Sequence, residues 1–169
     1  MGYGTDEDAG ARDRASKPSD RHSSGGIAVT LTFDGTVVVP VADPDDGERT
    51  TAALEPYLTS TSTVVVVNVI EKAGGGIDKA PMAQREEYAE KIYERARRAL
   101  EDSPASVEFD TLYGTDVVET IFAAAEDRSA DAVAFTPRKG NRLAELLTGD
   151  VARRIVREAT IPVVGLPQE

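Results

Sequence analysis

Short apolar runs rich in β-branched residues alternate with stretches of helical periodicity from Thr36 to the C-terminal end of the chain. Five of these runs have the length and composition of strands: Thr36–Val41, Thr63–Ile70, Ser106–Leu112, Asp131–Thr136 and Ile161–Leu166. Four of the five are continuous apolar runs, which is typical of strands buried on both faces of a parallel sheet. The run Ser106–Leu112 alternates with a period of two and is expected at a sheet edge, with one face in water.

The segments between the runs predict four helices. These cover Glu48–Leu58, Ala83–Leu100, a segment that begins after Asp116, and Asn141–Thr160. Asp116 is a good N-cap because Glu119 follows three positions later. The apolar residues of the second helix recur every four positions and predict one buried face, formed by Tyr88, Ile92, Ala96 and Leu100.

Strands that alternate with helices predict an α/β fold. Right-handed crossovers between five such strands give a doubly wound, parallel five-stranded sheet of Rossmann-like type, with helices on both faces. We assign residues 36–167 to this single domain, because a chain of 169 residues is too short to make two ordinary domains.

The chain before this domain has two parts. Residues 1–26 are rich in Gly, Ser, Asp and Arg and have almost no large apolar side chain, so they are predicted to form a disordered tail. Residues 27–35 form an extended lead-in segment, in which Ile27, Val29, Leu31 and Phe33 lie on one side. The sequence leaves open whether this segment forms a hairpin with the next run, covers a sheet edge or stays loose.

The charge of the chain bears on its partners. Its formal charge of −11 comes from 30 acidic and 19 basic residues, of which 14 are Arg and 5 are Lys. Binding to nucleic acid or to an anionic membrane is therefore not expected. The composition is of the haloarchaeal type and suits a salt-rich cytoplasm, where high ionic strength screens the repulsion between carboxylates.

The absence of Cys from the chain excludes disulfides, thiolate catalysis and Cys-ligated metals. The longest apolar run, Val64–Val67, is far shorter than a membrane span, and residues 1–26 lack the apolar stretch of a secretory signal. We therefore expect a soluble cytoplasmic protein.

A ligand site is expected beyond the carboxyl ends of the strands, where helix N-termini present free N–H groups. Four stretches occupy this place: Pro40–Asp46, Asn68–Gly76, Gly114–Asp116 and Pro137–Asp150.

Several motifs in these stretches resemble those of a known family. The run Val37–Val41 with its Asp-rich turn, the run Asp131–Thr136, and the segment Leu146–Val156 that leads into Ile161–Val164 are similar to the first strand, fourth strand and C-terminal part of universal stress proteins. The similarity covers residues 36–167, and its C-terminal part is the most specific. It implies the fold of the adenine nucleotide alpha hydrolase-like group, with strand order 3-2-1-4-5.

The resemblance also implies a nucleotide site, from which this sequence departs. Nucleotide-binding members of the family carry a first-strand Asp and a Gly-x2-Gly-x9-Gly-Ser/Thr loop, in which backbone amides approach the phosphates. Here the first-strand Asp position is Ala42, the two earlier glycine positions are Thr136 and Lys139, and the hydroxyl position after Gly149 is Asp150. A carboxylate at position 150 would repel a triphosphate.

Two functions from different classes follow from these departures. The first is a non-enzymatic, dimeric stress-response or regulatory protein whose nucleotide site is reduced or lost, with no certain cofactor. The second is an ATP- or AMP-binding protein that uses backbone contacts. The site positions that the resemblance implies are Pro40, Val41, Ala42, Val69, Thr136, Lys139, Gly149, Asp150 and Val151. A third hypothesis, that the protein is a related nucleotide hydrolase, has less support. No constellation of acid/base or nucleophilic residues stands out, and the single His22 lies in the tail.

Two charged clusters have alternative interpretations. Arg138, Lys139 and Arg142 could clamp a phosphate group, although a solvated loop is the favoured interpretation. The Asp-rich segment Asp43–Asp46 could bind Mg²⁺, but Pro44 and Gly47 favour a plain turn with a helix cap.

The resemblance finally implies a homodimer. In the family the final strand commonly pairs with its copy in a second subunit, and Ile161–Leu166 has the β-branched content for that pairing. Pro162 suits an edge strand because it lacks an N–H group. We expect Val163, Val164 and Leu166 to lie at or beside the interface.

Overall fold

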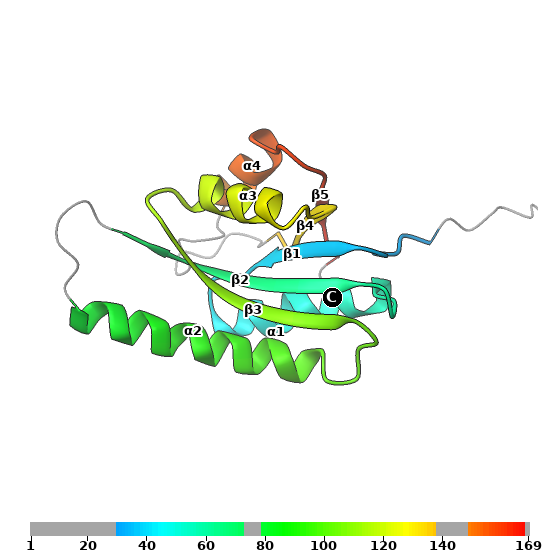
Figure 1. The fold of residues 1–169 in the computed structure, drawn as a ribbon, viewed down its shortest axis with the longest axis horizontal. Helices are drawn as coiled ribbons and strands as arrows, with labels where there is room; N and C mark the ends of the chain where they lie inside the picture. Colours follow the sequence, from blue (N-terminus) through cyan, green and yellow to red (C-terminus); the bar gives the residue numbers. More distant parts are fainter. Residues whose placement is uncertain (1–29, 73–78, 138–148, 168–169) are drawn as a thin grey trace, which may run out of the picture.

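The fold of the computed structural model is a single parallel sheet with two helical layers (Figure 1). The structure describes residues 30–72, 79–137 and 149–167. Its strands are β1 (Thr36–Pro40), β2 (Thr63–Glu71), β3 (Ser106–Gly114), β4 (Ala132–Phe135) and β5 (Val163–Gly165). They follow the order β3-β2-β1-β4-β5, and every pair is parallel. The predicted fold class and strand order are confirmed.

The sheet is covered on both faces. Helices α1 (Pro44–Leu54) and α2 (Lys79–Ala99) lie on one face, and α3 (Val117–Asp127) and α4 (Gly149–Arg157) lie on the other (Figure 1). A short 3-10 helix, η1 (Glu55–Tyr57), follows α1. Because successive side chains of a strand point to opposite faces, each strand supplies both cores. Val37 and Val39 of β1 pack toward α1 and α2, whereas Val38 packs toward α3 and α4.

The burial of β1, β2 and β4 follows the predicted pattern, whereas β5 is only half-buried. The central strands are closed to solvent, and Val64–Val67 of β2 lie opposite Val37–Pro40 of β1. The alternating strand β3 lies at one edge of the sheet, as its pattern predicts, and β5 lies at the other. Leu166, expected beside a dimer interface, is only 3% exposed and packs in the chain's own core.

Three helix predictions need correction. Helix α1 begins at Pro44 rather than Glu48, because Asp43 accepts the Asp46 N–H as N-cap and Pro44 suits the first helical position. It ends at Leu54 rather than Leu58, and η1 follows it. The fourth helix ends at Arg157 rather than the predicted Thr160, and its predicted part before Gly149 lies outside the described residues.

Helix α2 begins at Lys79 rather than Ala83, and its buried face was predicted incorrectly in one position. Tyr88 is 45% exposed, whereas Tyr93 is buried and donates to the carbonyl oxygen of Asp110 at 2.7 Å. The core-facing residues of α2 and of the turn that follows it are spaced by mixed three- and four-residue steps: Ala89, Ile92, Tyr93, Ala96 and Leu100. A strict four-residue step drifts around the helix, so Tyr88 falls outside the face.

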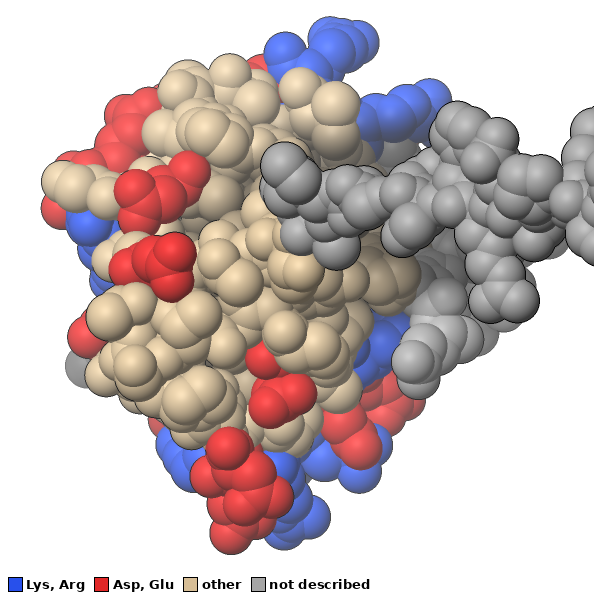
Figure 2. Space-filling view, turned by 90° about the vertical axis from the view of Figure 1, so that its right-hand side faces the viewer, with Lys and Arg blue, Asp and Glu red and all other residues tan. Residues whose placement is uncertain are grey.

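The described part of the lead-in segment runs beside the loop that follows η1. Phe33 is buried in the α1 and α2 core and forms an isolated parallel bridge with Leu58. The segment therefore extends β1 outward and forms no hairpin with it. Figure 2 views the end of the molecule at which the strands begin, and uncharged residues form most of the middle of that face.

Candidate functional site

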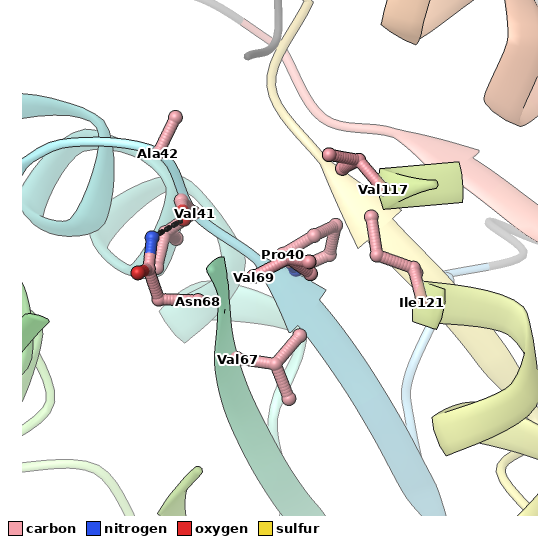
Figure 3. Close-up of a pocket in the computed structure, with 8 residues that line it drawn as sticks. All are labelled: Pro40, Val41, Ala42, Val67, Asn68, Val69, Val117 and Ile121. Carbon is pink, nitrogen blue, oxygen red and sulfur yellow. Dashed lines mark hydrogen bonds between the residues drawn. The ribbon is translucent and has the colours of Figure 1, made fainter. Parts of the chain in front are cut away.

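The carboxyl ends of β1 and β2 frame a narrow pocket beside α3 (Figure 3). It is lined by Pro40, Val41, Ala42, Val67, Asn68, Val69, Val117 and Ile121. Its volume is about 10 Å³, close to the space that one water molecule needs. Sites for small organic ligands commonly measure about 300–1,000 Å³, so a nucleotide base would require the pocket to widen.

Hydrogen bonds within the chain fix the rim of this pocket. The side-chain amide of Asn68 donates to the carbonyl oxygen of Val41 at 2.8 Å (Figure 3). The N–H of Val41 donates to the carbonyl oxygen of Val67 at 2.9 Å, and the N–H of Ala42 donates to Oδ2 of Asp46 at 2.9 Å. The N–H groups of Val41 and Ala42 in the turn after β1 are therefore already bonded.

Asp46 is the residue that holds this turn. Its side chain is fully buried and accepts hydrogen bonds from Arg49 at 2.8 Å and from the hydroxyl of Thr50 at 3.4 Å. Arg49 supplies the opposite charge that a buried carboxylate needs. The Asp-rich turn is thus organised by backbone and arginine contacts, with Asp45 paired to Arg95 at 2.8 Å. Among the described residues, no group of three His, Cys, Asp or Glu side chains could hold a metal ion.

The remaining predicted site positions lie around β4 and α4. Thr136 follows β4 and is 1% exposed, and its Oγ1 atom has no hydrogen-bond partner in the described part of the chain. Gly149 is the first residue of α4. Asp150 is exposed, and its Oδ1 atom lies 3.7 Å from Nη2 of Arg153. Val151 packs against the core between the sheet and helices α3 and α4. Lys139, together with Arg138 and Arg142, lies outside the described residues.

An ion pair ties α4 to the start of α3 near this end of the sheet. The Nη2 atom of Arg154 lies 2.9 Å from Oδ2 and 3.1 Å from Oδ1 of Asp116, the predicted N-cap of α3. The Glu119 N–H, which donates to Asp116 at 2.9 Å, and then Arg154 lower the pKa of Asp116. The Nε atom of Arg154 also lies 2.9 Å from Oε1 of Glu158, so this side chain has a structural role.

Half of the residues that line this pocket were predicted as site positions from the sequence. Pro40, Val41, Ala42 and Val69 were among the predicted positions and do line it. Asn68 was not singled out, although an amide inside the apolar run of β2 is a signal that a buried partner exists. Val117 and Ile121 of α3 were not singled out as site residues, because helical periodicity does not distinguish a core residue from a pocket wall.

A family model decides the relationship of this chain to known proteins. The model described as "Usp: Universal stress protein family" matches residues 35–167. The chain belongs to the universal stress protein family. No match was found among curated proteins.

Solved universal stress proteins share this fold. A structure from Archaeoglobus fulgidus is 24% identical, with a TM-score of 0.58 over 78% of this chain and 98% of that chain. A structure of the universal stress protein from Archaeoglobus fulgidus in complex with dAMP is 19% identical, with a TM-score of 0.56 over 82% and 99%. A universal stress protein in complex with cAMP is 16% identical, with a TM-score of 0.59 over 80% and 98%. Identities this low establish the fold alone.

None of the described helices is both long and apolar enough to cross a membrane.

Proposed function

We propose that this universal stress protein acts as a non-enzymatic, homodimeric stress-response or regulatory module in which the family's nucleotide site is reduced. The proposal rests on the backbone hydrogen bonds of the turn after β1. The N–H groups of Val41 and Ala42 face partners within the chain, so neither is left to bind a base. Recognition of a polar ligand in an apolar pocket depends on a few such groups, and breaking an internal bond to supply one carries a cost.

The chemistry of the pocket supports a role without catalysis. Its lining is apolar apart from Asn68, whose amide nitrogen is bound to Val41. A general base or nucleophile must lie within hydrogen-bond reach of the group on which it acts. Neither Asn68 nor an aliphatic side chain can perform that task.

Calorimetric titration with ATP at millimolar Mg²⁺ tests the reduced site. We expect weak or undetectable binding, because Ala42, Lys139 and Asp150 replace three features that hold nucleotide in the family. The double variant Ala42→Asp with Asp150→Ser should bind more tightly than the wild type. The control Glu101→Ser, at an exposed position near the opposite end of the sheet, should change nothing. Low-micromolar affinity of the wild type would contradict the proposal.

A second candidate, binding of ATP or AMP through backbone contacts, has one observation in its favour. Thr136 carries a buried hydroxyl with no partner in the described part of the chain, at the position where the family's loop begins. Buried polar groups are normally hydrogen-bonded, so an orphaned hydroxyl favours a ligand. If this candidate is correct, AMP raises the melting temperature in a concentration-dependent way, and Thr136→Val abolishes that effect.

The homodimer is proposed to form through β5. This strand is short, lies at the sheet edge and is preceded by Pro162, which has no N–H group to leave unpaired. The outer edge of such a strand is a template for pairing with another chain, and pairing around a two-fold axis closes it.

A further inference from the structure

A groove lies beside β5 near the amino ends of the strands, at the end of the sheet opposite the narrow pocket. Its volume is about 540 Å³, and it is lined by residues 31–35, by Asp131 and Ala132 at the start of β4, and by Pro162 and Val164 at β5. The match to the family model begins at residue 35. One wall of the groove therefore comes from the lead-in segment, of which residues 31–34 precede the family match.

This wall is held in place by hydrogen bonds. The N–H of Phe33 donates to the carbonyl oxygen of Tyr57 at 2.9 Å. The hydroxyl of Ser62 accepts the Thr59 N–H at 2.7 Å and donates to the carbonyl oxygen of Phe33. The Thr59 hydroxyl donates to Asp34 at 3.0 Å. The lead-in segment is thus a built part of the domain, because its main chain and its one buried aromatic ring are both anchored.

The side of the lead-in segment that faces the groove has fewer hydrogen bonds within the described part of the chain. Leu31 lines the groove and is 47% exposed. In an extended segment the backbone groups of successive residues point to opposite sides, so those of Thr32 and Asp34 point away from Tyr57 and toward the groove. Among the described residues, no backbone–backbone hydrogen bond involves Thr32 or Asp34. The groove thus offers an apolar side chain and an open strand edge.

The charges around the groove are compatible with a second copy of the chain. Its two carboxylates are already bonded, since Asp34 accepts from Thr59 at 3.0 Å and Asp131 accepts the Thr36 N–H at 2.9 Å. The rest of its lining is uncharged. Two copies that each carry a charge of −11 repel each other over most of their surfaces, so they approach most easily where charge is sparse. Figure 2 shows that uncharged residues form most of the middle of this end of the molecule.

The chain's own N-terminal part is poorly suited to fill the groove. Residues 27–30 are Ile, Ala, Val and Thr, which favour extended backbone and provide no turn by which the chain could fold back on itself. Residues 1–26 have almost no large apolar side chain to place in it.

We propose that a second copy of this chain covers the groove, so that the lead-in segment and β5 form one continuous dimer interface. The inference rests on the proposed dimer: Pro162 and Val164 belong both to the groove and to the edge of β5, so a copy paired with β5 lies against the groove. In a two-fold dimer each copy contributes the same patch, and Leu31 of each copy becomes buried.

Sedimentation of Leu31→Asp, beside the wild type and a matched control, tests this interface. The control is Val156→Asp, which alters another exposed aliphatic side chain, 63% exposed, on α4. Leu31→Asp should weaken dimerisation about tenfold or more, because each dimer loses two buried leucines, while Val156→Asp should leave it unchanged. Both variants should keep the monomer's unfolding transition, since neither side chain is in the core.

The outcomes separate the inference from the dimer proposal. A wild type that is monomeric at tens of micromolar overturns both. A dimeric wild type whose affinity is unaffected by Leu31→Asp overturns only the inference.

Thiol labelling gives a second readout, because the chain has no cysteine and a single introduced thiol reports without background. In a Leu31→Cys variant, labelling by a maleimide should slow as protein concentration drives dimer formation, whereas labelling of a Val156→Cys variant should not. Protection that is the same in monomer and dimer would mean that the chain covers its own groove. That result, or no protection at all, would refute coverage by a second copy.

Discussion

Asp131 occupies the space beside Gly35 that a side chain at position 35 would need. A Cβ atom at that position would overlap Oδ2 of Asp131, which accepts the Thr36 N–H at 2.9 Å. The Asp131 N–H in turn donates to the carbonyl oxygen of Thr36 at 2.8 Å. The absence of a side chain at Gly35 therefore allows β4 to dock against the first residue of β1.

The substitution Gly35→Ala should destabilise the domain. The new methyl group displaces the exposed Asp131 carboxylate and breaks its bond to Thr36, at an expected cost of about 0.5–1.5 kcal/mol. Chemical denaturation measures the loss. Gly165→Ala is the matched control, because a Cβ atom there would meet only Pro137, at an ordinary distance of 3.7 Å. Equal stability of the two variants would show that the Asp131 contact is unimportant.

The ion pair at the start of α3 should make stability depend on pH. The Glu119 N–H and then Arg154 lower the pKa of Asp116 from its ordinary value of 3.8, so folding favours the charged form. The resulting stabilisation is complete above that value and is lost as pH falls through the folded pKa. Asp116→Asn keeps a capping oxygen but removes the charge, so it should be less stable than the wild type at neutral pH and converge with it in acid.

Denaturant unfolding over a series of pH values checks this convergence. Asp116→Ala serves as a control because it also loses the capping oxygen, and its deficit of about 0.5–2 kcal/mol should persist in acid. A constant difference between the wild type and Asp116→Asn at every pH would disprove the electrostatic contribution.

Removal of residues 1–26 should leave the cooperative unfolding transition unchanged. That segment has almost no apolar side chains with which to join a core. Differential scanning calorimetry of the full and shortened chains provides the comparison. A melting temperature lowered by several degrees would show that the segment packs on the domain.

The substitution Val164→Lys should shift the protein toward monomer. A lysine at the centre of β5 places a charge at the proposed interface, and edge lysines oppose strand pairing. Sedimentation analysis measures the shift, with Val156→Lys on α4 as the control and thermal unfolding as the check on folding. An unchanged dimer would exclude the β5 edge as the interface.

The sequence predicted those parts of the fold that depend on local pattern. The valine runs of β1 and β2 and the alternation in β3 were sufficient to place these strands, because burial on two faces or on one leaves a distinct periodicity. The start of α1 was placed too late, although Asp43 followed by Pro44 is a sequence signal for a helix N-terminus, because a turn before the helix also fits these residues. Phe33 could not be placed, since its burial depends on a loop that comes later in the chain.

The site was predicted less completely, for a physical reason. The resemblance to the family located Val41 and Ala42. Whether their N–H groups can bind a ligand depends on their hydrogen-bond acceptors in the fold, Val67 and Asp46, which residue spacing does not identify. Asn68 is the exception, because an amide in an apolar strand must have a partner, and that rule could have drawn attention to it.

The central place of β1 also affects how the chain folds. Its pairing with β2 joins segments that are close in sequence, whereas its pairing with β4 brings together Thr36 and Asp131, which are 95 positions apart. Contacts of such long range form slowly, because the intervening chain must be ordered first. We therefore expect β1, β2 and β3 to assemble with α1 and α2 before β4 and β5 dock. On this route, substitutions in the contact between β1 and β4 accelerate unfolding far more than they slow folding.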